Sequence, residues 1–175
     1  MKKVGIIGAG SWGIALSVVL AKNGHDVIVW SIIKEEIDML KEKREHVDKL
    51  PGVKLDEKIV FTTDLESAVK ESDMIVLAVP SVFTRSTARS MAAFVKDDQI
   101  IVCVAKGIEE ETLMTITDVV ESEIKNADVA VMCGPSHAEE VGIGLPTTVV
   151  AGAKTRATAE LIQDTFMNEV FRVYT

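Results

Sequence analysis

Cysteine and histidine are scarce in this chain of 175 residues, which contains two cysteines and three histidines. Cys103 and Cys133 both lie in apolar, strand-like runs and form no C-x-x-C motif, so we expect two buried free thiols. Free thiols fit a reducing compartment, and we expect the protein to be cytoplasmic. The histidines are scattered without the spacing of metal ligands, so no metal site is predicted.

Positive charge is also in deficit, with 19 lysines and arginines against 27 aspartates and glutamates and a formal net charge of −8. This balance argues against nucleic acid or an anionic membrane surface as the main partner. No apolar run approaches the ~20 residues that a transmembrane helix needs, so we expect no membrane insertion. The first apolar run is too short for a signal peptide. A composition of 47% hydrophobic and 26% charged residues is that of a globular domain.

The most informative stretch is a G-x-G-x-x-G pattern formed by Gly8, Gly10 and Gly13. An apolar run precedes it and an apolar helical pattern follows it, which is the strand–turn–helix context of a dinucleotide-binding fingerprint. In that context Gly8 allows the tight turn, Gly10 lets a pyrophosphate approach, and Gly13 lets the helix pack against the strand. The helix start would attract the phosphates. The alternative is an ordinary glycine-rich turn between a strand and a helix.

Strand-like and helix-like segments alternate along the whole chain. This alternation predicts an α/β fold over residues 1–175, a doubly wound, mostly parallel, Rossmann-like sheet with helices on both faces. Ligands of such sheets bind beyond the carboxyl ends of the strands. Strands are predicted over residues 4–7, 26–30, 59–61, 74–79, 100–104, 129–132, 147–150 and 170–174, and helices over 14–22, 34–43, 83–94, 113–124 and 157–167, with short helices beginning at the capping-box spacing of Thr63 and Glu66 and near Pro135.

The end of the second predicted strand bears on the choice between NAD and NADP. NAD-binding domains usually carry an acidic residue about 20 residues past the glycines, where it accepts hydrogen bonds from the adenosine ribose. This chain has Ser31 there and no acid before Lys34. Ser31 would not repel a 2′-phosphate, and Lys34 either helps to neutralise one or simply begins a solvated helix face. The preference is left open, with a slight lean towards tolerance of NADP.

Three more candidates follow the next two central strands. Pro80 cannot donate a ladder hydrogen bond, so its turn either borders the nicotinamide-ribose side of the cleft or is a plain strand stop. Phe83 either stacks at the mouth of the cleft or lies in the core. Lys106 follows an apolar run and precedes Gly107. Its ammonium either enters the cleft, facing phosphates or a carbonyl oxygen, or its stem extends along the strand edge.

The segment GPSHAEE, residues 134–140, follows the next predicted strand. Ser136 and Glu139 have capping-box spacing, and a helix that begins at the cleft can also bind an anionic or polar substrate. His137 is a candidate general base. No carboxylate stands at an obvious spacing to orient it, so a structural histidine is the alternative.

As an ordered set, these motifs resemble those of the bacterial glycerol-3-phosphate dehydrogenase (NAD(P)+) family. The resemblance implies reversible hydride transfer between glycerol 3-phosphate and dihydroxyacetone phosphate, in the synthesis of phospholipid precursors. The matching segments are GAGSWGIAL at residues 8–16, LP at 50–51, VPS at 79–81, AKGIE at 105–109, GPSHAEEV at 134–141, LPTTV at 145–149 and FRVYT at 171–175.

The resemblance also implies roles for individual residues. Many members carry Arg or His shortly after the strand-2 tryptophan, whereas this chain has Ile32 and Ile33, so the resemblance does not carry that contact to the adenosine phosphate over to this chain. His137 becomes a weaker candidate for the base. The implied cofactor contacts are Ser11, Trp12, Lys106 and Ala138, beside Gly8, Gly10, Gly13, Ser31, Pro80 and Phe83 from the residues themselves, and the implied contacts to a small phosphate substrate are Lys106, Gly134 and Ser136.

In the family, a second, all-helical domain follows the FRVY strand and supplies the catalytic lysine. The resemblance therefore implies that residues 1–175 are the cofactor-binding domain, that they contain no catalytic residue, and that they bind NAD or NADP without turnover. A homodimer is one expectation for the full-length protein, with contacts from the second domain. The alternatives are another two-domain reductase of the hydroxyacid or ketopantoate type, or a Rossmann domain that senses nucleotide without chemistry.

Overall fold

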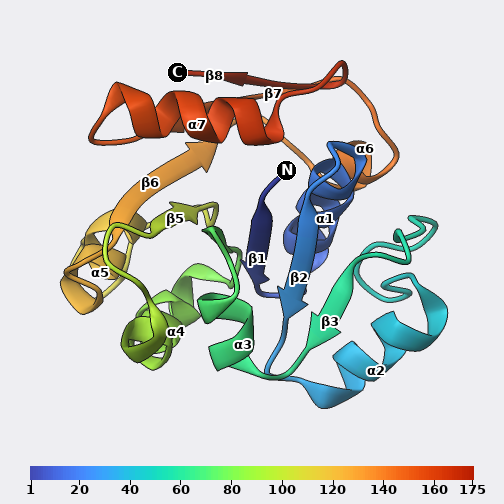
Figure 1. The fold of residues 1–175 in the computed structure, drawn as a ribbon, viewed down its shortest axis with the longest axis horizontal. Helices are drawn as coiled ribbons and strands as arrows, with labels where there is room; N and C mark the ends of the chain where they lie inside the picture. Colours follow the sequence, from blue (N-terminus) through green and yellow to red (C-terminus); the bar gives the residue numbers. More distant parts are fainter.

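The computed structural model describes all of residues 1–175 and contains one eight-stranded sheet with helices on both faces (Figure 1). Its strands are β1 (Lys3–Ile7), β2 (Asp26–Trp30), β3 (Val60–Thr62), β4 (Met74–Leu77), β5 (Ile100–Cys103), β6 (Asp128–Cys133), β7 (Thr147–Gly152) and β8 (Phe171–Tyr174). They lie in the order β3-β2-β1-β4-β5-β6-β7-β8. Every neighbouring pair is parallel except β6 and β7. The predicted doubly wound, mostly parallel sheet is confirmed.

Seven α-helices cover the two faces of the sheet: α1 (Ser11–Lys22), α2 (Lys34–Lys43), α3 (Leu65–Lys70), α4 (Thr84–Met91), α5 (Ile116–Glu123), α6 (Ala138–Gly142) and α7 (Arg156–Phe166). Helices α1, α2, α6 and α7 share one hydrophobic core, and α3, α4 and α5 share the other. Successive side chains of a strand point to opposite faces, so Ile6 packs into the first core and Ile7 into the second.

The strands at the centre and at the far edge of the sheet differ in how they are covered. Every residue of β4 is buried, as expected for a parallel strand with helices on both sides. In β7 and β8 buried and exposed residues alternate. Val150 and Tyr174 are 52% and 55% exposed on the outward side. The far edge of the sheet is therefore packed on one face only.

The same uncovered face corrects the prediction for Cys133. Cys103 is buried in β5 as expected, but Cys133 is exposed. Cys133 ends β6 one residue after the buried Met132, so strand alternation points its side chain away from the core. An apolar run alone does not bury both faces of a strand.

Two predicted helix starts also need correction. The cap of α3 is Asp64, whose carboxylate accepts from the backbone N–H of Ser67, rather than a Thr63–Glu66 box. Helix α5 begins later than the predicted residue 113, because Thr115 and Asp118 form the capping box there. Short capping side chains occur at several neighbouring positions, and the one that satisfies the first N–H groups depends on where the backbone turns.

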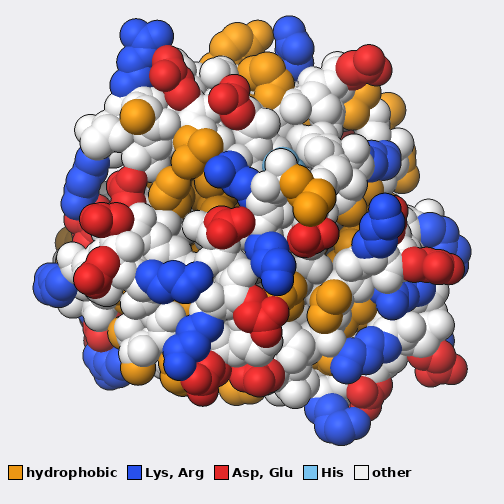
Figure 2. Space-filling view, viewed as in Figure 1, with side chains coloured by type: hydrophobic (Ala, Val, Ile, Leu, Met, Phe, Trp, Pro, Cys, Tyr) orange, Lys and Arg blue, Asp and Glu red, His pale blue; other side chains and the backbone are white.

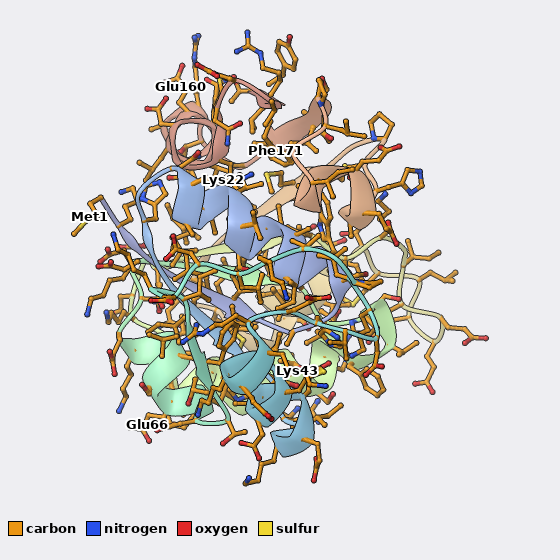
Figure 3. The ribbon with its side chains drawn as sticks, turned by 90° about the vertical axis from the view of Figure 1, so that its right-hand side faces the viewer. Met1, Lys22, Lys43, Glu66, Glu160 and Phe171 are labelled. Carbon is orange, nitrogen blue, oxygen red and sulfur yellow. The ribbon has the colours of Figure 1, made fainter.

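The elements spread from one edge of the sheet to the other. In Figure 3, Glu160 of α7 and Phe171 of β8 lie at one end of the molecule, and Lys43 of α2 and Glu66 of α3 lie at the other. Figure 2 shows acidic and basic side chains interspersed over one face, without a broad area of either sign. None of the helices combines the length and the apolar character needed to cross a bilayer.

Candidate functional site

Two cavities meet at the carboxyl ends of the central strands, on either side of the glycine turn. The first, the β2-side cavity, has a volume of about 570 Å³, and the second, the β5-side cavity, about 530 Å³. Both are lined by Gly10, Ser11, Ala78, Val79 and Pro80. Because the two cavities share these lining residues, they adjoin each other, and we refer to them together as the cleft. It lies at the topological switch point between β1 and β4.

Most predicted site residues line this cleft. In the β2-side cavity they are Gly8, Gly10, Ser11, Ser31, Pro80 and Phe83. In the β5-side cavity they are Gly10, Ser11, Trp12, Pro80, Lys106, Ser136 and Ala138, together with His137. Gly13 and Gly134 line neither cavity.

The three glycines of the turn meet three different steric demands. Gly8 has a φ of +119°, and a Cβ there would come within 2.8 Å of the Ala78 backbone. A Cβ on Gly13 would approach the carbonyl oxygen of Gly8 to 2.1 Å. A Cβ on Gly10 would meet no atom within 4 Å. Gly8 and Gly13 are therefore required by the fold, whereas Gly10 leaves open space beside the cleft.

The start of α1 fits an anion. Gly10 is the N-cap residue, no side chain caps the helix, and its first turn contains no acidic residue. The first N–H groups of the helix thus have no side-chain acceptor, and the positive end of the helix dipole lies at the cleft. With the open space at Gly10, this arrangement accommodates the pyrophosphate of a dinucleotide.

Lys106 connects the two loops that line the β5-side cavity. It lies beyond the end of β5, is exposed, and is followed by Gly107 at a φ of +125°. Its Nζ donates a hydrogen bond to the backbone carbonyl of Ser136 across 3.3 Å. The ammonium therefore lies in the cleft rather than along the strand edge.

The turn at Ser136 differs from the predicted capping box. The N-cap of α6 is His137, which makes no side-chain cap, and the hydroxyl of Ser136 donates weakly to the carbonyl of Gly134 at 3.4 Å. A Cβ on Gly134 would meet the carbonyl oxygen of Thr148 at 2.6 Å, so this glycine packs against β7. His137 is exposed, and no hydrogen bond to a carboxylate orients its ring.

A carboxylate that the sequence interpretation missed lies at the end of β2. The side chain of Glu36 reaches back from the first turn of α2, and the hydroxyl of Ser31 donates to it. The same carboxylate contacts His46 Nε2 at 2.9 Å and pairs with the ammonium of Lys49. The signal was present in the sequence: Glu36 shares the buried face of α2 with Ile37 and Leu40, where an acid is unusual.

The surroundings of Lys34 and Phe83 show which of the two predicted positions each side chain takes. Lys34 lies on the solvent face of α2, pairs with Asp38 and lines neither cavity, so it begins a solvated helix face. Phe83 is 57% exposed and lines the β2-side cavity, so it stands at the mouth of the cleft and not in the core. Ile32 is 80% exposed at the same mouth.

Comparisons with known proteins show which sequences this chain resembles. The model of the family described as NAD-dependent glycerol-3-phosphate dehydrogenase N-terminus matches residues 3–159. The chain is 75% identical over 175 residues to the glycerol-3-phosphate dehydrogenase (NAD(P)+) of Agathobacter rectalis, covering 100% of this chain and 52% of that protein. The corresponding enzyme of Fusobacterium nucleatum is 51% identical over 177 residues, covering 100% of this chain and 53% of that protein.

A solved structure of a glycerol-3-phosphate dehydrogenase has the same fold. The crystal structure of glycerol-3-phosphate dehydrogenase from Coxiella burnetii superposes with a TM-score of 0.93 at 28% identity, covering 99% of this chain and 53% of that one. The chain thus spans about half the length of the curated relatives it matches.

Proposed function

The chain belongs to the NAD-dependent glycerol-3-phosphate dehydrogenase family, and we propose that it is the dinucleotide-binding part of an enzyme that interconverts glycerol 3-phosphate and dihydroxyacetone phosphate. The observation that carries the proposal is the pair of adjoining cavities on either side of the glycine turn, with the ammonium of Lys106 at the β5 end. An enzyme of this kind uses NAD or NADP and acts in the synthesis of phospholipid precursors. We propose that the enzyme acts in the cytoplasm and does not bind nucleic acid.

Each part of the cleft suits one part of the cofactor. The uncapped start of α1 would hold the pyrophosphate through the N–H groups of Ser11 and Trp12. The β2-side cavity, with Ser31 and Phe83, would hold the adenosine. The β5-side cavity, with Pro80 and Ala138, would hold the nicotinamide end, which when bound accepts or donates the hydride.

The substrate would bind beside the nicotinamide end, in the β5-side cavity. Lys106 carries a positive charge into a site that is to hold a phosphate ester. Its hydrogen bond to Ser136 keeps that charge beside the turn of residues 134–136. Gly134 lines neither cavity, so its predicted contact with the substrate rests on the resemblance alone and would be made by its backbone.

We propose that proton transfer at the substrate hydroxyl uses a group from outside residues 1–175. The resemblance to the glycerol-3-phosphate dehydrogenase family implies that a second domain supplies the catalytic base and completes the substrate site. His137, the candidate base within this chain, has no hydrogen bond to a carboxylate that would orient its ring. A homodimer of the longer protein stays a prediction.

Binding of the cofactor can be tested by fluorescence titration of the 175-residue chain with NADH and NADPH. Trp12 lines the β5-side cavity and Trp30 lines the β2-side cavity, so each reports on one half of the cleft. We expect a saturable change in tryptophan emission. The absence of such a change at millimolar cofactor would contradict the proposal.

Turnover separates the cofactor-binding part from a complete enzyme. We expect residues 1–175 to show no oxidation of NADH with dihydroxyacetone phosphate. A longer protein with the second domain should oxidise NADH with this substrate and not with ketopantoate or hydroxyacid precursors. Measurable turnover by the 175 residues would contradict the requirement for a second domain.

A further inference from the structure

The cluster of Ser31, Glu36, His46 and Lys49 places charged side chains in the wall of the β2-side cavity. Glu36 is 8% exposed, yet its carboxylate lines the β2-side cavity. Among the residues that line this cavity, Glu36 and Lys49 are the only two with charged side chains. A buried carboxylate, paired with a half-exposed lysine, thus faces the space where the adenosine would lie.

Glu36 keeps its charge in this position. Burial raises the pKa of the carboxyl, but hydrogen bonds from Lys49, Ser31 and His46 together outweigh burial, and the net pKa lies below the ordinary value. The other charged groups of α2 face solvent, where Lys34 pairs with Asp38. The cavity wall therefore presents one negative and one positive group that offset each other.

NAD and NADP differ at the 2′ position of the adenosine ribose, which lies at the end of β2 in this fold. A carboxylate accepts a hydrogen bond from a 2′-hydroxyl and repels a 2′-phosphate, whereas an ammonium favours the phosphate. We propose that the Glu36–Lys49 pair sets the selectivity of this chain between NAD and NADP. Glu36 takes the part of the acid missing from the strand end, and Lys49 offsets its repulsion of the phosphate. The inference rests on the proposed function.

Lys49 can interact with either cofactor because its side chain is only partly fixed. Its side chain is 46% exposed, and its ammonium pairs with the buried Glu36 oxygen that also contacts His46. The lysine side chain is a flexible stem of four carbons. Its ammonium can therefore move from the Glu36 carboxylate to a phosphate while the backbone stays in place. Glu36 would then keep its contacts with Ser31 and His46.

The test compares the dissociation constants for NADH and NADPH in charge variants of the 175-residue chain, measured by tryptophan fluorescence at one pH and low salt. Glu36→Gln removes the negative charge in the same shape, and the ratio of the two constants should shift towards NADPH by about tenfold. Lys49→Met keeps the stem and should shift the ratio towards NADH by about the same factor. The double variant should return close to the unmodified chain.

The matched controls are Glu66→Gln and Lys70→Met. These two residues form a Glu–Lys pair on α3, half-exposed and outside both cavities. In both control variants the ratio of the dissociation constants for NADH and NADPH should equal that of the unmodified chain. A circular dichroism melt checks that each variant folds, and if Glu36→Gln does not fold, the half-exposed Lys49→Met carries the test.

The outcomes separate this inference from the proposed function. If both cofactors bind and the variants change both constants equally, the pair is structural and the inference is overturned while the proposed function stands. If neither cofactor binds to the unmodified chain, both are overturned. Opposite shifts from the two single variants support the inference.

Discussion

The carbonyl oxygen of Gly8 lies against the Cα of Gly13, so closely that a Cβ on Gly13 would approach it to 2.1 Å. This contact joins the end of β1 to the first turn of α1. Gly10 lies between them in sequence and faces no atom within 4 Å of its Cβ position. One motif thus contains glycines for packing and a glycine for access.

The first prediction separates these two parts. Gly13→Ala should lower the free energy of unfolding by about 1–3 kcal/mol, because the added methyl overpacks the turn. Gly10→Ala should change the free energy of unfolding by less than about 1 kcal/mol, because its extended backbone suits alanine, whereas an N-cap position favours glycine over alanine. It should still weaken NADH binding at least about tenfold, since the methyl occupies the space needed by the pyrophosphate. Thermal melts and NADH titrations measure both effects, and full NADH affinity in Gly10→Ala would contradict the interpretation.

The second prediction concerns Thr84, whose hydroxyl is buried without a hydrogen-bond partner. The residue is 1% exposed at the start of α4. Thr84→Val replaces the hydroxyl with a methyl of similar size, and the free energy of unfolding should rise by about 1 kcal/mol. Thr84→Ser is the control: it keeps the hydroxyl, loses the methyl and should destabilise. Urea titrations measure both, and a less stable valine variant would show that the hydroxyl is satisfied in solution.

The third prediction follows from the ion pairs of Arg85, which contacts Glu109 at 2.6 Å and Glu123 at 2.7 Å. Hydrogen bonds from Arg85 to Glu109 lower the pKa of that carboxyl from 4.5 to about 2. Arg89 and then Arg85 lower the pKa of Glu123 from 4.5 to about 2 as well. A depressed carboxyl pKa stabilises the fold above the unfolded value, and this contribution is lost as the pH falls through the folded value.

Arg85→Met should therefore melt at a lower temperature than the unmodified chain above about pH 4.5, the ordinary carboxyl value. The difference should shrink between that pH and about 2, where the two carboxylates become protonated in the folded chain. Arg156→Met, which removes an exposed pair with Glu160, is the control and should change little. A difference in melting temperature that does not vary with pH would assign the Arg85 effect to packing.

The fourth prediction concerns the two thiols. Burial, with a smaller contribution from Glu121, raises the pKa of Cys103 to about 12, whereas Cys133 is exposed at the end of β6. A thiol-specific reagent at neutral pH should therefore label one cysteine in the folded chain and two in denaturant. Cys133→Ser should abolish labelling of the folded chain, and Cys103→Ser should not. Rapid labelling of Cys133→Ser would show that β5 opens.

The candidate site could be predicted from sequence where its residues follow strands directly. Lys106 and Ser136 lie beyond the ends of β5 and β6, and parallel strands bring their carboxyl ends to one edge of the sheet. Their hydrogen bond was not predictable, because it depends on the loop geometry that follows each strand. Glu36 was missed for a related reason: the acid was expected on the strand end, and the fold supplies it from the next helix.

The sequence by itself determined the succession of strands and helices along the chain and the position of the glycine turn. Both depend on apolar periodicity and glycine conformation, which act over a few neighbouring residues. It also predicted α2 at its observed bounds of Lys34–Lys43. Only the tertiary structure decided that β7 runs antiparallel to β6, that Cys133 faces outward, and that Glu36 meets Ser31 and Lys49. These features depend on which faces of distant segments pack together, and no short-range pattern specifies that choice.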